Sequence, residues 1–448
     1  ALVDEEELTR KFALRDEDQA VLQGAAQAES RDVSFTIWDY GGQKVFYALH
    51  HIFLTDKGLY LVVFDMREIV GKEHFRDTLT LEEYQKLSTQ AEAIEFLRFW
   101  LHSIRLHAPE APVLMIGTFL DQVTQLREVN RVLREHVGAT SHKHLVKPSN
   151  GGHLFFAIDN SSNDKDRAGE LRTAIASVAS EQRYVREQVP LAWLKLHEDM
   201  LQSREPFMLY DEVVERAAEY GRPRADVDAM LEYFHGLGVV VHLRGSQTLE
   251  RVVVIDAEWL LKKLARVIAD DLHAQPLFSD PDLESAGLLP AYERLRRDMI
   301  ATRSLLEWLW ADQEVDYLLQ FMEANMLLCP WRFNEHRDED EYLVSGLLSD
   351  SSKQIDTRDF EPGLTCELDF SEFFLPNGVF HRLVAQCAAY ASQPEVAGDD
   401  EPMLPALDSK HAMLSFGVND FMFTVDGDVV RICIDAAAER PAMVIKLL

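Results

Sequence analysis

The chain has 448 residues, of which 47% are hydrophobic and 27% charged, a composition that excludes an intrinsically disordered protein. Its length is roughly two to three times that of a usual domain, so at least two hydrophobic cores are expected. The net charge of -31, from 76 acidic and 45 basic side chains, repels phosphate backbones and argues against nucleic acid as a partner.

Cysteine spacing and hydropathy argue against a structural metal site and against a transmembrane segment. The four cysteines lie far apart, with no Cys-x-x-Cys pair and no histidine at zinc-site spacing, which predicts reduced thiols and no structural metal. No apolar run reaches the roughly 18 residues that span a bilayer, so no transmembrane segment is predicted. The chain begins at Ala1 in an acidic stretch, without a signal peptide or initiator Met, which favours a cytoplasmic piece of a longer protein.

The first region, over about residues 32–180, alternates apolar strands with amphipathic helices. Between its second and third strands, residues 93–104 place Ile94, Leu97 and Leu101 on one helical face, which predicts a helix that covers a sheet. Alternating strands and helices favour a parallel sheet with crossover helices, and therefore an α/β fold. The predicted strands are 33–38, 58–64, 113–117 and 154–158.

The second region is predicted to be mainly helical. Residues 193–201 and 210–220 have the apolar spacing of helices, and 230–238 ends in a glycine that favours a helix end. Residues 239–243 and 251–255 are expected to form two strands of a small hairpin around an Arg-Gly-Ser turn. Helices followed by such a hairpin predict a winged-helix-like unit.

The third region, from about Tyr342, is predicted to be strand-rich and of the α+β type. The dipeptide Asp426-Gly427 predicts a tight turn between two strands. The stretch 392–410, rich in Pro, Asp and Glu, is expected to be a mobile loop, and the acidic stretch 337–341 a solvated one. The predicted strands are 342–344, 364–369, 421–425 and 429–434.

The most informative motif is Trp-Asp-Tyr-Gly-Gly-Gln, residues 38–43, at the end of the first predicted strand. An Asp at the carboxyl end of a strand, here Asp39, can hold the water shell of a phosphate-bound Mg²⁺. Gly41 and Gly42 let backbone N–H groups approach a γ-phosphate, and Gln43 can orient an attacking water. The same residues also suit a plain tight turn, since short motifs match by chance.

Two more predicted strands end in candidate base-binding residues. In residues 115–121, the carboxylate of Asp121 can accept hydrogen bonds from N1 and N2 of guanine, which adenine cannot donate. The alternative is that Asp121 caps the next helix. After the fourth predicted strand, Asp159 and Asn160 are the expected further contacts, or else an Asx-turn that starts a helix.

These motifs resemble those of the ROCO family. Residues 38–43 resemble the second switch of Ras-like GTPases, and Thr118-Phe119-x-Asp121 is similar to the family's Thr-x-x-Asp variant of the Asn-Lys-x-Asp element, with Phe119 in the Lys position. Later apolar signatures resemble, in order and spacing, the COR module that follows the family's Roc GTPase domain. They are 231–238, 254–260, 318–323, 342–348 and 373–383.

The resemblance implies a GTP-hydrolysing switch that binds GTP/GDP and Mg²⁺, forms a homodimer through COR and has protein partners in signalling. It implies a Roc domain over 1–182, a first COR half over 183–341 and a second COR half over 342–448. Gly42 and Gln43 would be catalytic. The implied contacts with nucleotide or Mg²⁺ are Asp39, Gly41, Gly42, Thr118, Asp121, Asp159 and Asn160.

The sequence departs from the family pattern because it has no G-x-x-x-x-G-K-[ST] phosphate loop. Only 37 residues precede Trp38, too few for a strand, phosphate loop, helix and first switch, so the start of Roc is expected to be missing. Thr9 is the candidate for the magnesium-binding threonine of the first switch. The COR module is expected to continue beyond Leu448, and the chain as given is predicted to bind nucleotide poorly.

Two other functions compete with the switch. A degenerate Roc-like sheet could serve as a nucleotide-free scaffold whose acidic surface selects protein partners. An ordinary hydrolase finds no support, because the sequence has neither a G-x-S-x-G elbow nor an H-E-x-x-H motif. Relatives often carry leucine-rich or ankyrin repeats before Roc and a protein kinase after COR, and neither is visible in this sequence.

Overall fold

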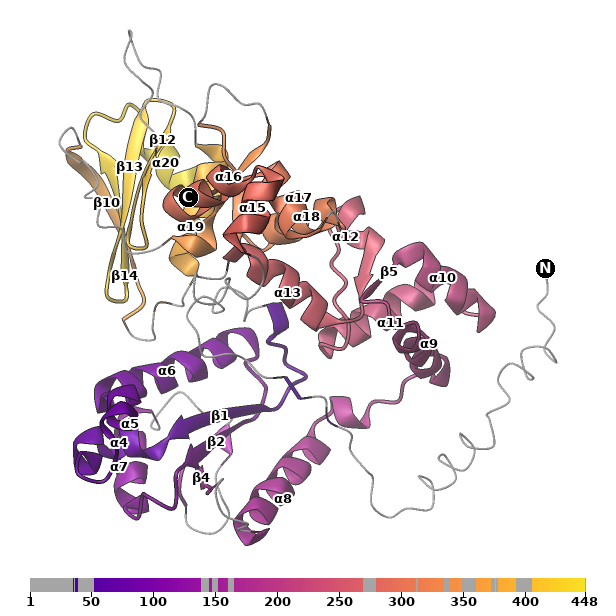
Figure 1. Ribbon diagram of the computed structural model, residues 1–448, viewed down its shortest axis with the longest axis vertical. Helices are drawn as coiled ribbons and strands as arrows, with labels where there is room; N and C mark the ends of the chain where they lie inside the picture. The colour runs from indigo at the N-terminus through magenta and orange to yellow at the C-terminus, as the bar shows by residue number, and fades with distance from the viewer. Residues whose placement is uncertain are drawn as a thin grey trace. The chain divides into compact units, whose positions relative to one another are not determined.

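The chain divides into two compact units, which are described separately. A computed structural model describes residues 35, 37–38, 52–137, 145–146, 152–159, 165–268, 279–311, 313–333, 339–348, 360–371, 375, 378–391 and 405–447 (Figure 1). The N-terminal unit comprises 1–39 and 53–241, and the C-terminal unit comprises 40–52 and 242–448. Among the described helices, none combines the length and hydropathy needed to cross a membrane.

A parallel sheet forms the core of the first half of the N-terminal unit. Strand β2 (Val113–Thr118) lies between β1 (Tyr60–Asp65) on one side and β3 (Leu145–Val146) with β4 (Phe156–Ala157) on the other. The parallel arrangement confirms the α/β prediction, and three of the four predicted strands are present. The fourth, 33–38, lies mostly outside the described residues.

Helix α6 (Gln90–His107) is the predicted covering helix and packs on β1. Thr89 starts it with a capping box: the backbone N–H of Glu92 donates to the Thr89 hydroxyl, and the Glu92 carboxylate accepts from the backbone N–H of Thr89. Its apolar face is buried at Ile94, Leu97, Leu101 and Ile104, as the spacing predicted. The remaining helices around this sheet are α4 (Met66–Val70), α5 (Leu81–Lys86), α7 (Leu126–His136) and α8 (Lys165–Glu181).

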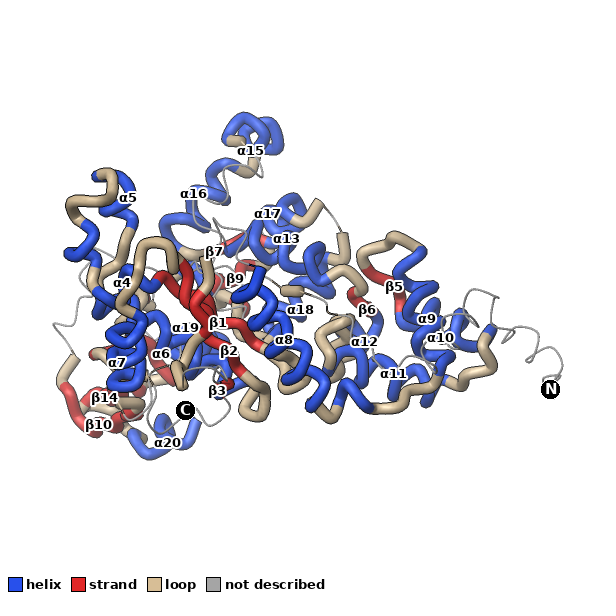
Figure 2. The backbone as a smooth tube through the Cα atoms, turned by 90° about the horizontal axis from the view of Figure 1, so that it is seen from below, coloured by secondary structure: helices blue, strands red, loops and turns tan. Residues whose placement is uncertain are grey.

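The described residues from 182 to 241 of the N-terminal unit are mainly helical. Figure 2 shows α9 (Leu191–Gln202), α10 (Tyr210–Glu219) and α11 (Arg224–Gly236) in blue, and the short strand β5 (Phe207–Leu209), which comes directly before α10 in the chain, in red. All three helices were predicted. Helix α11 ends near Gly238, which has a φ of +71° and donates its N–H to the carbonyl of His235 at 2.9 Å, the usual role of glycine at a helix end.

The predicted hairpin over 239–243 and 251–255 is wrong. Residues Gln247–Arg251 form a helix, α12, which is followed directly by a three-residue strand, β6 (Val252–Val254). The Ser246 hydroxyl accepts a hydrogen bond from the backbone N–H of Leu249 at 3.2 Å, so the Arg-Gly-Ser segment starts a helix rather than turning a hairpin.

A small antiparallel sheet follows in the C-terminal unit, in the order β7 (Ile300–Thr302), β9 (Glu341–Val344), β8 (Leu328–Pro330). Strand β9 was predicted. The helices around this sheet are α13 (Ala257–Ile268), α15 (Asp280–Ala286), α16 (Leu289–Asp298), α17 (Arg303–Leu309) and α18 (Val315–Ala324).

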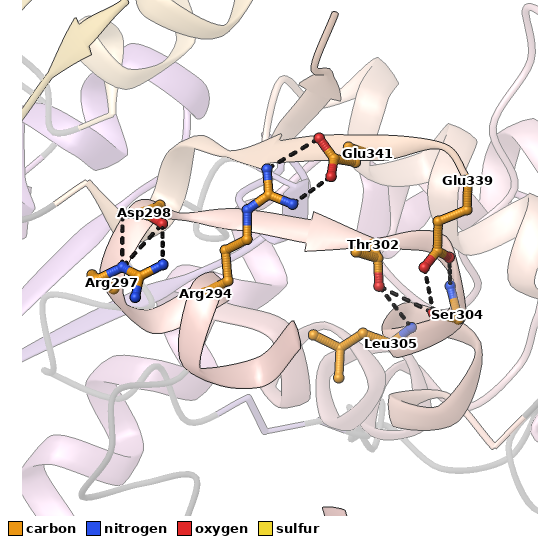
Figure 3. Close-up of polar contacts among 8 residues, drawn as sticks. All are labelled: Arg294, Arg297, Asp298, Thr302, Ser304, Leu305, Glu339 and Glu341. Carbon is orange, nitrogen blue, oxygen red and sulfur yellow. Dashed lines mark hydrogen bonds and ion pairs between the residues drawn. The ribbon is translucent and has the colours of Figure 1, made fainter. Parts of the chain in front are cut away.

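One residue of the acidic stretch 337–341, expected to be a solvated loop, is instead buried. Glu341 begins β9, is 8% exposed, and forms a two-point ion pair with Arg294 of α16, with Nη2 to Oε2 at 3.1 Å (Figure 3). Glu339 accepts hydrogen bonds from the backbone N–H and hydroxyl of Ser304, at 2.8 and 2.9 Å. Glu339 therefore binds the first turn of α17, and Glu341 joins β9 to α16, although the sequence predicted that both side chains would be solvated.

A five-stranded antiparallel sheet forms the end of the chain, in the order β10 (Pro362–Asp369), β14 (Val429–Asp435), β13 (Asn419–Asp426), β12 (His411–Phe416), β11 (Ala406–Leu407). Gly427, with a φ of +58°, makes the predicted turn between β13 and β14. Helices α19 (Val379–Tyr390) and α20 (Pro441–Leu447) lie on one face of the sheet (Figure 1), where Phe421 and Phe423 are fully buried. Residues 392–404 of the expected mobile loop are outside the described residues.

Candidate functional site

The candidate site lies where the parallel strands of the N-terminal unit end. Asp65 at the end of β1 is opposite Thr118 at the end of β2, and Gly117 is opposite Ala157 of β4. The carboxyl ends of three strands therefore meet at one edge, the place where open α/β sheets bind ligands. Two of the predicted base-binding segments, 118–121 and 158–159, begin at this edge.

Backbone hydrogen bonds join these two segments directly. The N–H of Ile158 donates to the carbonyl of Gly117 at 2.8 Å, and the N–H of Leu120 donates to the carbonyl of Ile158 at 3.2 Å. A Cβ on Gly117 would lie 2.7 Å from Cγ of Met66 and 2.9 Å from Cδ2 of Phe155, so only glycine fits there. Close packing around Gly117 thus fixes the backbone from which the two loops start.

The Thr118 hydroxyl already has a partner inside the protein. It donates a hydrogen bond to the carbonyl oxygen of Phe64 in β1, at 3.0 Å. This bond joins the ends of β1 and β2 across the site edge. In this structure Thr118 orders the loop that carries Asp121, and its predicted contact with nucleotide remains a prediction.

Asp121 is exposed, and no hydrogen bond or ion pair of its carboxylate is found within the part of the chain that the structure describes. Helix α7 begins at Leu126 with Gln125 as its N-cap. The alternative that Asp121 caps this helix is therefore wrong. An exposed carboxylate without an internal partner, at the carboxyl edge of a parallel sheet, is available to accept hydrogen bonds from a ligand.

The loop before Asp121 has a strained backbone. Phe119 has a φ of +62°, a region that bulky side chains rarely adopt and that costs about 1–3 kcal/mol. Its carbonyl accepts hydrogen bonds from the N–H groups of Gln122 and Val123, at 3.1 and 3.0 Å, so a tight turn holds this conformation. Strain of this kind gathers at functional sites, where surrounding structure maintains it.

Sequence reasoning missed Arg67, which lies at the same edge and is only 8% exposed. Its guanidinium donates to both carboxylate oxygens of Asp65, with Nη2 to Oδ2 at 2.7 Å, and to the side-chain oxygen of Gln122 at 3.0 Å. Its Cζ is 3.5 Å from the centre of the Phe119 ring. In the sequence, Asp65-x-Arg67 at the end of a strand indicates only the start of a helix. The partner of Arg67 on the other loop, Gln122, is more than fifty residues away, so no local pattern reveals the contact.

The remaining candidate residues cannot be placed at this edge. Asp39, Gly41, Gly42, Gln43, Asn160 and Thr9 lie outside the described residues. Of the switch motif only Trp38 is described, and its ring stacks on that of Phe53 with centroids 5.9 Å apart. Within the described ranges, no three His, Cys, Asp or Glu side chains are grouped so as to hold a metal ion.

Two protein-family models match the chain in tandem. The model "Ras of Complex, Roc, domain of DAPkinase" matches residues 4–121, which include the strands β1 and β2 and the Thr118–Asp121 loop. The model "C-terminal of Roc, COR-A domain" matches residues 190–348, from the start of α9 to just beyond β9.

Curated relatives match over most of this chain. Cyclic GMP-binding protein C of Dictyostelium discoideum is 23% identical over 369 residues, which is 79% of this chain and 12% of that protein. Leucine-rich repeat serine/threonine-protein kinase 1 of Mus musculus is 23% identical over 391 residues, 81% of this chain and 17% of that protein. The chain thus spans less than a fifth of the length of either relative.

Among solved structures, the chain is similar to Methanosarcina barkeri Roco2 RocCORdC bound to GDP. The TM-score is 0.43 at 17% sequence identity, and the match covers 69% of this chain and 79% of that one.

Proposed function

Because this chain belongs to the ROCO family, with a Roc domain followed by a COR-A domain, we propose that it is a guanine-nucleotide-binding switch. The proposed switch binds GTP or GDP at the carboxyl edge of the parallel sheet and hydrolyses GTP. Its state passes to the COR module, which forms a homodimer and contacts protein partners in signalling.

The observation that carries the proposal is the state of the Asp121 carboxylate. It is exposed at the sheet edge, without a partner among the described residues, on a loop hydrogen-bonded to the Ile158–Asp159 segment. Guanine presents two neighbouring donors, N1–H and the N2 amino group, which one carboxylate can accept together, whereas adenine offers no such pair. Hydrogen bonds to a charged acceptor contribute roughly 1.5–3 kcal/mol each, enough to make the site selective for guanine.

Hydrolysis is assigned to the switch motif, residues 38–43. Asp39 is proposed to hold the water shell of Mg²⁺, an ion that takes oxygen ligands, and Gly41 and Gly42 to bring backbone N–H groups to the γ-phosphate. When bound, Mg²⁺ neutralises charge on the phosphates. Gln43 orients the water that attacks the γ-phosphate. This part of the proposal rests on the motif and on the family.

The five-stranded sheet of the C-terminal unit supports the proposed dimer. Strand β10 lies at one edge of this sheet, and its Leu364 and Leu368 are 50% and 38% exposed. Both side chains are on the same face as Cys366, which packs against the core of that unit. Exposed apolar side chains at the edge of a packed sheet face favour burial against a partner. Light scattering over a range of concentrations tests the dimer, and a strict monomer at high concentration contradicts it.

The domain division proposed from sequence is Roc over 1–182, a first COR half over 183–341 and a second over 342–448. The COR-A match over 190–348 supports a boundary between residue 182 and residue 190. It also ends close to the second proposed boundary. Limited proteolysis with mass spectrometry would locate both boundaries.

Titration of fluorescent GDP into the protein in its full natural length, with ATP as competitor, tests the nucleotide site. We expect saturable binding that unlabelled GDP reverses and equal ATP does not. Binding of both nucleotides alike removes the role of Asp121. Absence of any binding favours the scaffold function, in which the Roc sheet only supports protein contacts.

A further inference from the structure

The aromatic ring of Phe119 packs on Arg67 and is also partly exposed. The guanidinium of Arg67 packs on one face, 3.5 Å from the ring centre, yet the residue keeps 36% of its surface exposed. Its backbone has a φ of +62° in the tight turn that follows β2. A large apolar ring held towards solvent by a strained backbone points to an absent planar partner.

Arg67 itself is held in place by hydrogen bonds to two side chains. Asp65 accepts from its Nε, its Nη2 and its backbone N–H, the last at 2.8 Å, so side chain and backbone are fixed by one carboxylate. Gln122 accepts from Nη1 at 3.0 Å, and Gln122 stands three residues after Phe119 in the same turn. A buried guanidinium with its donors engaged is a rigid support, since the planar fork has little freedom left to lose.

We propose that Arg67 is a positioning residue for purine recognition, which holds Phe119 as a stacking platform beside Asp121. The proposal rests on the proposed guanine-nucleotide function and adds how the base is oriented there. The free face of Phe119 stacks on the base, and Asp121, two residues later on the same loop, accepts from the edge of that base. Arg67, Phe119 and the base then form a layered stack.

Two physical effects make this arrangement useful. A cation against one ring face is attracted by the ring's negative quadrupole, so Arg67 keeps Phe119 from rotating or relaxing away from its strained conformation. A platform that is ordered before the ligand arrives avoids the entropic cost of ordering at binding. Arg67 contributes through Phe119, without contact with the nucleotide.

The test compares Arg67→Met with Arg131→Met in the protein at its full natural length, by titration of fluorescent GDP. Arg131 is a matched control because it also forms two ion pairs in the Roc region, with Glu128 and Glu135 of exposed α7. We expect Arg67→Met to raise the Kd for GDP about tenfold and Arg131→Met to leave it unchanged. The affinity for inorganic pyrophosphate, measured by competition with fluorescent GDP, should be the same in both variants, because pyrophosphate has no base.

A double-mutant cycle separates positioning from general structural loss. In a Phe119→Leu background, Arg67→Met should add less than about twofold to the Kd, because the ring through which Arg67 acts is gone. If Arg67→Met does not fold, Arg67→Lys serves instead: it keeps a cation beside Asp65, loses the planar stack, and is expected to give about a threefold loss that also vanishes in the Phe119→Leu background.

The outcomes are distinguishable. If the wild-type protein binds GDP selectively but the Arg67 variants match it, or if the two effects simply add in the cycle, the positioning role is overturned and the proposed function stands. If the wild-type protein binds no GDP, both are overturned.

Discussion

Acidic side chains lie near the ends of strands in two parts of the molecule, with internal partners in one part and none among the described residues in the other. In the small antiparallel sheet of the C-terminal unit, Glu341 is buried against Arg294, and Glu339 accepts from Ser304 (Figure 3). At the edge of the parallel sheet, Asp121 is exposed and has no partner among the described residues. A carboxylate with internal partners stabilises the fold, whereas one kept without them can recognise a ligand.

The contrast follows from sheet type. In the antiparallel sheet, Glu341 begins β9, which pairs with β7, and its carboxylate forms an ion pair with Arg294 of α16. Parallel strands need crossover helices, so the carboxyl ends of β1, β2 and β4 gather on one edge, each followed by a loop. Some side chains of those loops bind one another, as Arg67 and Gln122 do, whereas Asp121 is exposed.

The largest effect is expected for Asp121→Ala. Removing the acceptor of two guanine hydrogen bonds should weaken GDP binding by about 3 kcal/mol, or over a hundredfold, in a fluorescent GDP titration. The thermal midpoint should hardly change, since Asp121 has no described internal contact to lose. Asp77→Ala, at another exposed site of the same unit, is the control and should bind GDP like the wild type.

A smaller and opposite pattern is expected for Glu341→Ala. Loss of the buried partner of Arg294 should reduce the free energy of unfolding by about 2 kcal/mol, measured by urea denaturation, and leave GDP affinity unchanged. Glu258→Ala removes the pair with Lys262, in which both side chains are about two-thirds exposed, and should cost under about 0.5 kcal/mol. Equal losses in the two variants would contradict the distinction drawn between buried and exposed pairs.

The smallest effect concerns pH. Burial lowers the pKa of His381 on α19 below its ordinary value of 6.5, although a backbone contact with Leu348 opposes the shift. The unfolded chain therefore binds the proton more readily, so stability present above pH 6.5 is lost as pH falls towards the folded-state pKa. The thermal midpoint should drop between pH 7 and pH 5.5.

His381→Gln should reduce the slope of this pH dependence without abolishing it, because burial also lowers the pKa of His197 and His235. His136→Gln, on the exposed side of α7, is the control for replacing a histidine that is not buried. An unchanged slope in His381→Gln would mean that His381 is protonated equally easily in the folded and unfolded chain.

Much of the fold could be predicted because local patterns agree with it. The apolar runs at β1 and β2, the helical spacing of α6 and the Asp426–Gly427 turn each specify their structure within a few residues of sequence. The hairpin predicted around Arg244–Ser246 failed for a local reason as well: a serine that caps a helix and a serine in a turn look alike without their partners.

The candidate site was predictable only in part. Asp121 follows a strand at a spacing that sequence can reveal, and its position at the sheet edge agrees with that prediction. The stack of Arg67 on Phe119 and the burial of Glu341 depend on residues 52 and 47 positions apart in the chain, which no local pattern reports. Long-range contacts decide which polar side chains already have hydrogen-bond partners in the protein, and therefore which ones can bind a ligand.

The most direct test of the account is the base preference of Asp121→Asn, measured by competition of GDP and xanthosine diphosphate for fluorescent nucleotide. Guanine donates at both N1 and N2, whereas xanthine donates at N1 and accepts at O2, so an amide should pair with xanthine and a carboxylate with guanine. The account predicts that wild type prefers GDP and Asp121→Asn prefers xanthosine diphosphate. An unchanged preference for GDP in the variant would contradict the assignment of Asp121 as the residue that reads the base.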